Sequence, residues 1–144
     1  MAENQEVVIT LQKILDRLGG LPSRFQKQEN VEIGVGETKT VFTRTGHGIL
    51  REIIIRSPST DFRVAVLIDG EETLNASYSE LSVIGQNSNS ITAVEELDYD
   101  GNPTGYYVVS IRLLVCSEGI EVRVTNTGVS SIILSHVFVD YAIL

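Results

Sequence analysis

The chain has 144 residues, which is enough for one domain with a hydrophobic core. Its net charge is −8 and its 11 basic residues are scattered, which argues against a nucleic-acid partner because phosphate binding needs clustered Lys and Arg. Cys116 is the only cysteine, so no disulfide framework is expected, and no apolar run reaches the roughly 18 residues that a membrane-spanning helix needs.

Residues 1–30 are predicted to form a helical arm and a linker. Apolar side chains recur at helical spacing and are followed by Gly19, Gly20 and Pro22, which end a helix; the stripe consists of Val8, Leu11, Leu15 and Leu18. Residues 22–30 are polar and predict a spacer. A helix of this length is not stable alone in water, so we expect the stripe to be buried against the domain or against other copies.

Residues 31–144 are predicted to form a β domain, because the apolar period changes there from 3.6 to 2. Turns such as Asp69-Gly70 and the loop at residues 98–105 separate the expected strands. These strands are 31–35, 38–43, 49–56, 61–69, 91–97, 106–116, 120–125 and 131–144. About eight strands with no helix between them predict an all-β, antiparallel, jelly-roll-like sandwich.

The last strand is apolar on both faces. Strict alternation predicts an inward row of Ile133, Val137, Val139, Tyr141 and Ile143, and an outward row of Ile132, Leu134 and Phe138. Either a part of the same chain or another subunit must cover the outward row. The sequence therefore predicts a candidate assembly interface made of Val8, Leu11, Leu15, Leu18, Ile132, Leu134 and Phe138.

No catalytic, cofactor or metal site is predicted, and we expect that the protein is not an enzyme. His47 and His136 are the only histidines and have no adjacent carboxylate cluster, so they do not supply the ligands of a catalytic zinc site. Cys116 lies within a regular strand pattern and is interpreted as an apolar filler. The segment Asp98–Asn102 has the alternating oxygen ligands of a calcium loop but lacks the distal Glu, which favours a solvated turn.

The main alternative function is a binding module for a glycan or a host receptor. Sugar-binding sandwiches use exposed aromatic rings as platforms. The chain has no Trp, and most of its Tyr residues fall in strand patterns, so Tyr99 and Tyr106 are the candidate platforms.

Several segments between residues 45 and 142 share the strand-and-turn order of a known family. They are Gly48–Ile55, Ser57–Val64, Ile68–Gly70, Tyr78–Leu81 and Gly105–Ile111. In this order the chain resembles small virion proteins of tailed bacteriophages, namely head-decoration (cement) proteins and related tail or fibre β-sandwiches.

The resemblance implies a structural protein of the virion, synthesised in the host cytoplasm, that forms a homo-oligomer, commonly a trimer. Its other partner would be a major capsid or tail protein, with no nucleic acid and no membrane involved. The acidic N-terminus also predicts that no signal peptide is present. No functional residue is carried over, because such proteins act through extended surfaces.

Overall fold

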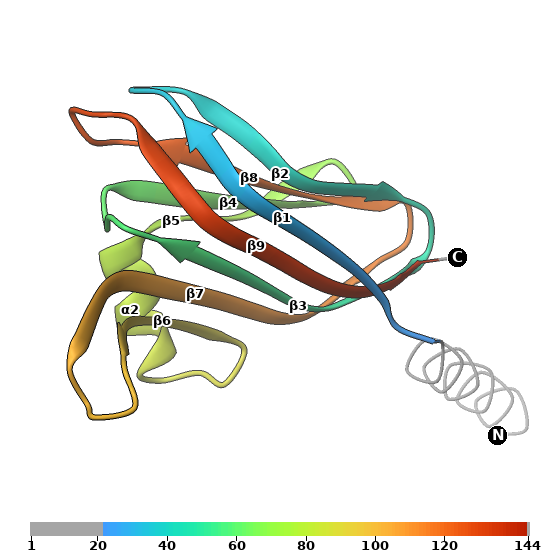
Figure 1. Ribbon diagram of the computed structural model, residues 1–144. Helices are drawn as coiled ribbons and strands as arrows, with labels where there is room; N and C mark the ends of the chain where they lie inside the picture. Colours follow the sequence, from blue (N-terminus) through green and yellow to red (C-terminus); the bar gives the residue numbers. More distant parts are fainter. Residues whose placement is uncertain (1–21, 144) are drawn as a thin grey trace, which may run out of the picture.

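The computed structural model describes residues 22–143, which form a two-layered antiparallel β-sandwich (Figure 1). Sheet A has five strands in the order β1-β9-β3-β7-β6, and sheet B has four in the order β2-β8-β4-β5. The elements are β1 (Arg24–Ile33), β2 (Thr38–Thr45), β3 (Gly48–Ser57), β4 (Phe62–Ile68), β5 (Glu71–Ser77), α2 (Tyr78–Gly85), β6 (Ile91–Leu97), β7 (Pro103–Cys116), β8 (Gly119–Asn126) and β9 (Ile132–Ile143).

The strand order is that of a jelly roll, which confirms the predicted fold class. Strands β1-β9-β3-β7 face β2-β8-β4-β5, and the chain passes between the layers as it does in jelly-roll domains. Strand β6 is not part of this eight-strand arrangement and is added at the β7 edge of sheet A. Helix α2 lies between β5 and β6 at this edge (Figure 1).

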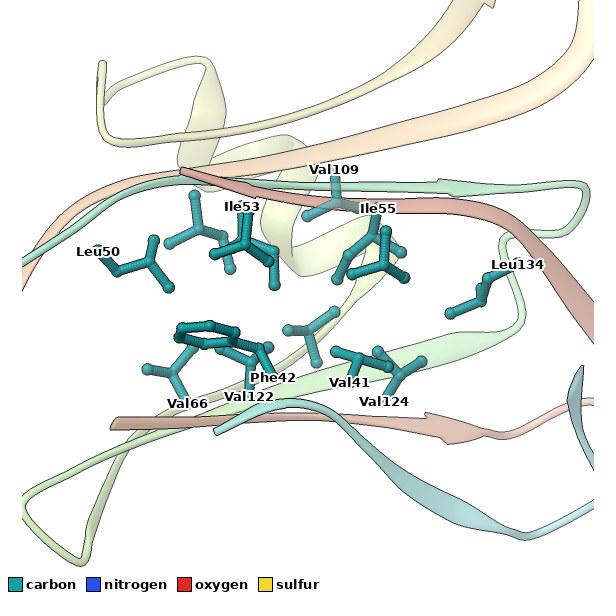
Figure 2. Packing of buried hydrophobic residues seen from close by; sticks show 14 of the residues in the cluster. Val41, Phe42, Leu50, Ile53, Ile55, Val66, Val109, Val122, Val124 and Leu134 are labelled. Carbon is teal, nitrogen blue, oxygen red and sulfur yellow. The ribbon is translucent and has the colours of Figure 1, made fainter. Parts of the chain in front are cut away.

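The core fills the space between the two sheets. In Figure 2, Leu50, Ile53 and Leu134 of sheet A point towards Phe42 and Val124 of sheet B. These side chains are at most 2% exposed, so the sheets are held together mainly by burial of apolar surface.

Residues 24–30, which the sequence predicted to be linker, are part of strand β1. This strand pairs with β9 from Arg24, opposite Tyr141, to Ile33, opposite Ile132. It is an edge strand held by backbone pairing, so a polar composition is compatible with it. Polar side chains also bind the other layer: the Gln28 amide donates a hydrogen bond to the Val41 carbonyl at 2.9 Å.

Strands β1 and β9 each contain one residue that is left out of their pairing, and this changes which side chains of β9 face the core. Glu29 lies opposite His136 and Val31 lies opposite Leu134, so Asn30 and Ser135 are both skipped. Asn30 has the left-handed φ of 54°, which asparagine adopts more readily than most residues.

As a result, the inward face changes from even to odd residue numbers between Leu134 and Val137. Ile132 and Leu134 are buried in the core, so the prediction that they face outward is wrong. Ile133 is 49% exposed and the prediction that it faces inward is also wrong. Phe138 faces outward as predicted and stacks on Phe25, with ring centroids 5.7 Å apart.

A second irregularity lies between β3 and β7. Leu50 pairs with Leu114 and Glu52 with Arg112, so Arg51 and Leu113 are both skipped, and Leu113 has a φ of 61°. Residues after Leu113 therefore exchange faces: Cys116 is buried while Leu113 and Val115 are exposed.

Neither strand β5 nor helix α2 was predicted from the sequence. The N-cap of α2, Ser77, accepts a hydrogen bond from the Glu80 backbone amide, and the Glu80 carboxylate accepts one from the Ser77 amide. This capping box is visible in the sequence as Ser-x-x-Glu, so the signal was present. Leu81 anchors the helix in the core.

The predicted turn at Asp69-Gly70 connects β4 and β5, and both residues have positive φ values. The Asp69 carboxylate accepts hydrogen bonds from the backbone amides of Ser117, Glu118 and Gly119, where the chain passes from β7 in sheet A to β8 in sheet B. These bonds lower the pKa of Asp69 from its usual 3.8 to about 2, with the Glu118 amide contributing most.

Candidate functional site

The structure describes three of the seven residues of the predicted assembly interface, and it separates them. The stripe of Val8, Leu11, Leu15 and Leu18 lies outside the described residues. Ile132 and Leu134 are core residues, and Phe138 is on the outer face of sheet A, the face turned away from sheet B.

Exposed apolar side chains are distributed unequally between the two sheets. Among residues 22–143, every large apolar side chain that is exposed within a strand belongs to sheet A; the set is Phe25, Val94, Leu97, Leu113, Val115 and Ile133. The outward positions of sheet B carry polar side chains such as Thr43, Arg63 and Glu121. The outer face of sheet A is therefore the candidate functional surface.

One end of this face is an aromatic and aliphatic strip along strands β1 and β9. Phe25 is 64% exposed and stacks on Phe138, whose strand neighbours are Lys27 and Ile54. Ile133 lies further along β9 on the same outer face and is separated from Phe138 by His136. We call Phe25, Phe138 and Ile133 the edge strip.

A second group lies where β3 and β7 carry their irregularity. Ile49 is opposite Val115, and Leu113 is two residues along β7 on the same outer face. We call Ile49, Leu113 and Val115 the bulge patch. Leu113 is the most exposed of the three at 67%, although a left-handed φ is unfavourable for leucine.

Polar side chains elsewhere on this face are paired with one another. The Arg56 guanidinium donates to both oxygens of Glu96, each at 2.8 Å, and lies 3.6 Å from the centroid of the Tyr106 ring. The hydrogen bonds raise the pKa of Arg56 and lower the pKa of Glu96. Arg56 also donates to Ser135 at 3.0 Å.

A similar ion pair joins β3 and β7. The Glu52 carboxylate accepts hydrogen bonds from Ser110 at 2.7 Å and from Arg112 at 2.9 Å. Because these charges are neutralised within the sheet, covering the face costs less than burying unpaired ions would.

The residues considered for catalysis are not brought together. Cys116 is buried, its thiol donates to the Gly46 carbonyl at 3.4 Å, and burial raises its pKa, which disfavours the nucleophilic thiolate. His136 lies on the outer face of sheet A, where its Nε2 is 3.7 Å from Glu29 and its Nδ1 is 3.2 Å from the Ser135 hydroxyl.

The acidic loop is organised by its own hydrogen bonds. Asp98 accepts bonds from the backbone amides of Asp100 and Asn102, both at 2.9 Å, in the manner of an Asx turn. Within residues 22–143 no group of three His, Cys, Asp or Glu side chains is placed to hold a metal ion. No helix in the described part of the chain is long and apolar enough to cross a bilayer.

The aromatic platforms considered for glycan binding differ in accessibility. Tyr99 is fully exposed on the acidic loop, whereas one face of Tyr106 is covered by Arg56. The stacked pair Phe25 and Phe138 was missed as a platform, because the sequence predicted Phe25 to lie in a linker.

The sandwich also has a cavity of about 270 Å³ at the β5–β6 edge. Its apolar lining includes Val66, Leu74, Ile91, Ile111 and Leu114. Helix α2 fills the other part of this edge with Leu81, so the cavity is the part of the edge that the helix leaves open.

No protein-family model matches the chain, and a search of curated proteins found no match. Among solved structures, the chain is similar to the catalytic domain of GH87 alpha-1,3-glucanase in complex with nigerose, with 14% identity and a TM-score of 0.37. A complex of a variant of that domain with tetrasaccharides gives the same values. The match covers 83% of this chain but only 28% of the glucanase chain, so our chain spans less than a third of its length. A likeness this low carries no argument about activity.

Proposed function

We propose that this chain is a non-enzymatic assembly protein of a virus particle, which associates with copies of itself and binds a capsid or tail. The observation that supports self-association is the concentration of exposed, strand-borne apolar side chains on the outer face of sheet A. The virion location, the trimer and the capsid or tail partner come from the resemblance to small phage virion proteins.

The edge strip is the part of this face that is best suited to a subunit contact. Phe25 and Phe138 provide a large apolar area in a rigid, stacked arrangement, and such aromatic anchors dominate many protein interfaces. Burying one such side chain is worth about 1.5–3 kcal/mol. The internally paired Arg56 and Glu96 next to the strip form a polar surround that needs no new partner.

Solution mass measured by light scattering over a range of concentrations tests the proposal. We expect an oligomer at high micromolar concentration, and we expect the double variant Phe25→Ala/Ile133→Ala to shift association to at least tenfold higher concentration. Val83→Ala is the control, because Val83 is similarly exposed but lies on α2, away from the face. A chain that stays monomeric at high micromolar concentration would contradict self-association.

Binding to the particle needs a separate measurement. Purified protein is mixed with capsids or tails that lack it, and co-sedimentation is compared between the intact chain and the double variant. Retention of the intact chain on one kind of particle is expected. A lack of retention on both would remove the virion proposal even if the chain is an oligomer.

The Phe25–Phe138 pair also favours a second candidate, a glycan-binding module. Flat exposed rings on a β-sandwich can stack on sugar faces. A glycan panel probed with the intact chain and with Phe25→Ala distinguishes the two: specific signal lost in the variant supports glycan binding, and a blank panel removes it.

A further inference from the structure

We propose that residues 7–18 of the same chain dock as a helix on the bulge patch, with the stripe of Val8, Leu11, Leu15 and Leu18 laid across Ile49, Leu113 and Val115. This proposal concerns the free subunit and goes beyond self-association, which we assign to the edge strip.

The bulge patch has two features that are unfavourable for a bare surface. Leu113 has a left-handed φ of 61°, where Gly or Asn would be less strained, and its side chain is largely exposed. Val115 beside it is 48% exposed. Apolar side chains held at a strained, outward position are accounted for if another apolar surface covers them.

The described chain begins in the same cross-sheet row as this patch. Arg24 lies opposite Tyr141, Tyr141 opposite Leu50, and Leu50 opposite Leu114, so the start of β1 is in the same cross-sheet row as the bulge. Arg51 is the β3 residue that is left out of the β3–β7 pairing together with Leu113. Its guanidinium donates a hydrogen bond to the Ser23 hydroxyl at 2.7 Å, so the chain just before β1 is held next to this irregularity.

The dimensions of the stripe match the span that it has to cover. Three strand spacings separate β1 from β7 in this sheet, which is about 14 Å. A helix from Val8 to Leu18 rises about 15 Å. The stripe can therefore extend from the start of β1 over β9 and β3 to Leu113 on β7.

The connection allows the chain to turn back over the sheet. Residues 19–22 can span up to about 13 Å, and two glycines in this segment, at positions 19 and 20, are compatible with backbone conformations that other residues avoid. A segment tethered this closely has a high effective concentration at its own sheet, which favours the same chain over a second copy as the source of the helix.

Thiol labelling of the full chain tests the proposal. Leu113→Cys is placed in a Cys116→Ala background, so that position 113 carries the only thiol, and the reaction with a maleimide is followed at concentrations where the chain is monomeric. We expect Leu11→Ser/Leu15→Ser to speed labelling at least tenfold. The control Lys13→Ser/Arg17→Ser, on the side of the predicted helix opposite the stripe, should leave the rate unchanged.

Equal rates in the intact and stripe-broken chains would overturn the proposal. Protection that appears only at concentrations where the mass rises would assign the patch to a second copy and would also overturn it. Because the mass of the edge-strip variant is measured separately, failure of this proposal and failure of self-association are distinguishable.

Fluorescence provides a second measurement if the cysteine variant folds poorly. The chain contains no Trp, so Val115→Trp introduces a single indole at a strand position. We expect the emission maximum to lie to the blue in the full chain and to shift to the red with Leu11→Ser/Leu15→Ser. An emission maximum that does not change would contradict docking.

Discussion

The two sheets follow the period-2 rule to different extents. In sheet B, strand β8 alternates without a break, and Val122 and Val124 point inward while Glu121 and Arg123 point outward. In sheet A, strands β1, β9, β3 and β7 each contain a residue that breaks the alternation. Sheet B also has breaks, at Val41 on β2 and at Thr73 on β5, but each lies on only one strand of its pair. The exposed strand positions of sheet B are polar, whereas the exposed large apolar side chains within strands lie in sheet A.

This difference shows how an apolar outer face can arise without a change in register. When both partners of a pair skip one residue, as Asn30 and Ser135 do, the strands stay aligned but both exchange faces. Residues on either side of the break then have opposite roles, such as the buried Leu134 and the exposed Ile133.

The largest effect is expected from substitutions at these two neighbours. Leu134→Ala removes a fully buried side chain and should lower the free energy of unfolding by about 2–5 kcal/mol. Ile133→Ala, on the outer face, should lower it by less than about 1 kcal/mol. Chemical denaturation of the monomer measures both, and a larger loss for Ile133→Ala would show that strict alternation holds in β9 after all.

The fold could be predicted from the sequence where turns and alternation agree. Asp69-Gly70 and the regular pattern of β8 identify β4 and β8 of sheet B, although β5 was not among the expected strands, and the number and order of strands predict the jelly roll. The first part of strand β1 could not be recognised, because an edge strand is held by backbone pairing that leaves no apolar pattern at residues 24–30.

The candidate site was less predictable for a different reason. The sequence indicates that β9 is apolar on both faces, but which residue belongs to which face depends on Ser135, which carries no visible signal of a break. A sequence signal for the break is present only at Asn30, a residue type that tolerates a left-handed φ and that lies far from Ser135 in the chain. The pairing of β1 with β9, which brings Asn30 and Ser135 together, was not predictable.

Sheet A contains a closer backbone approach than sheet B, where a Cβ at Gly119 would lie 2.9 Å from the Arg44 carbonyl oxygen. A Cβ at Gly48 on β3 would lie 2.4 Å from the Ala142 carbonyl oxygen and 2.6 Å from the Ile143 Cα of β9. Gly48→Ala should therefore cost about 2–3 kcal/mol, because backbone atoms would have to move. Gly34→Ala, where the new Cβ meets ordinary contacts, is the control, and thermal unfolding compares them. Equal melting temperatures would show that the backbones of β3 and β9 can move apart at little cost in stability.

A smaller effect of opposite sign is expected at Leu113. Replacing a leucine at a φ of 61° by asparagine relieves strain, so Leu113→Asn should stabilise the fold by about 1 kcal/mol or less. The gain should be measured in the Leu11→Ser/Leu15→Ser background, where the stripe no longer contacts position 113. In the intact chain the lost contact should cancel the gain or exceed it. A gain of equal size in both backgrounds would argue that Leu113 has no partner.

The smallest effect concerns the link between the two sheets at Asp69. Its pKa is depressed to about 2 in the folded protein, so its contribution to stability is present above the usual value of 3.8 and is lost as the pH falls through about 2. Asp69→Asn should therefore lower the melting temperature at pH 7, and the difference from the unsubstituted chain should shrink between pH 4 and 2. Other carboxylates titrate in both proteins, so the difference isolates Asp69. Glu71→Gln, an exposed carboxylate beside the same turn, removes the same charge and serves as the control. If the melting difference stays constant down to pH 2, the amides of residues 117–119 do not hold the charged form, and the crossing between the sheets is stabilised in some other way.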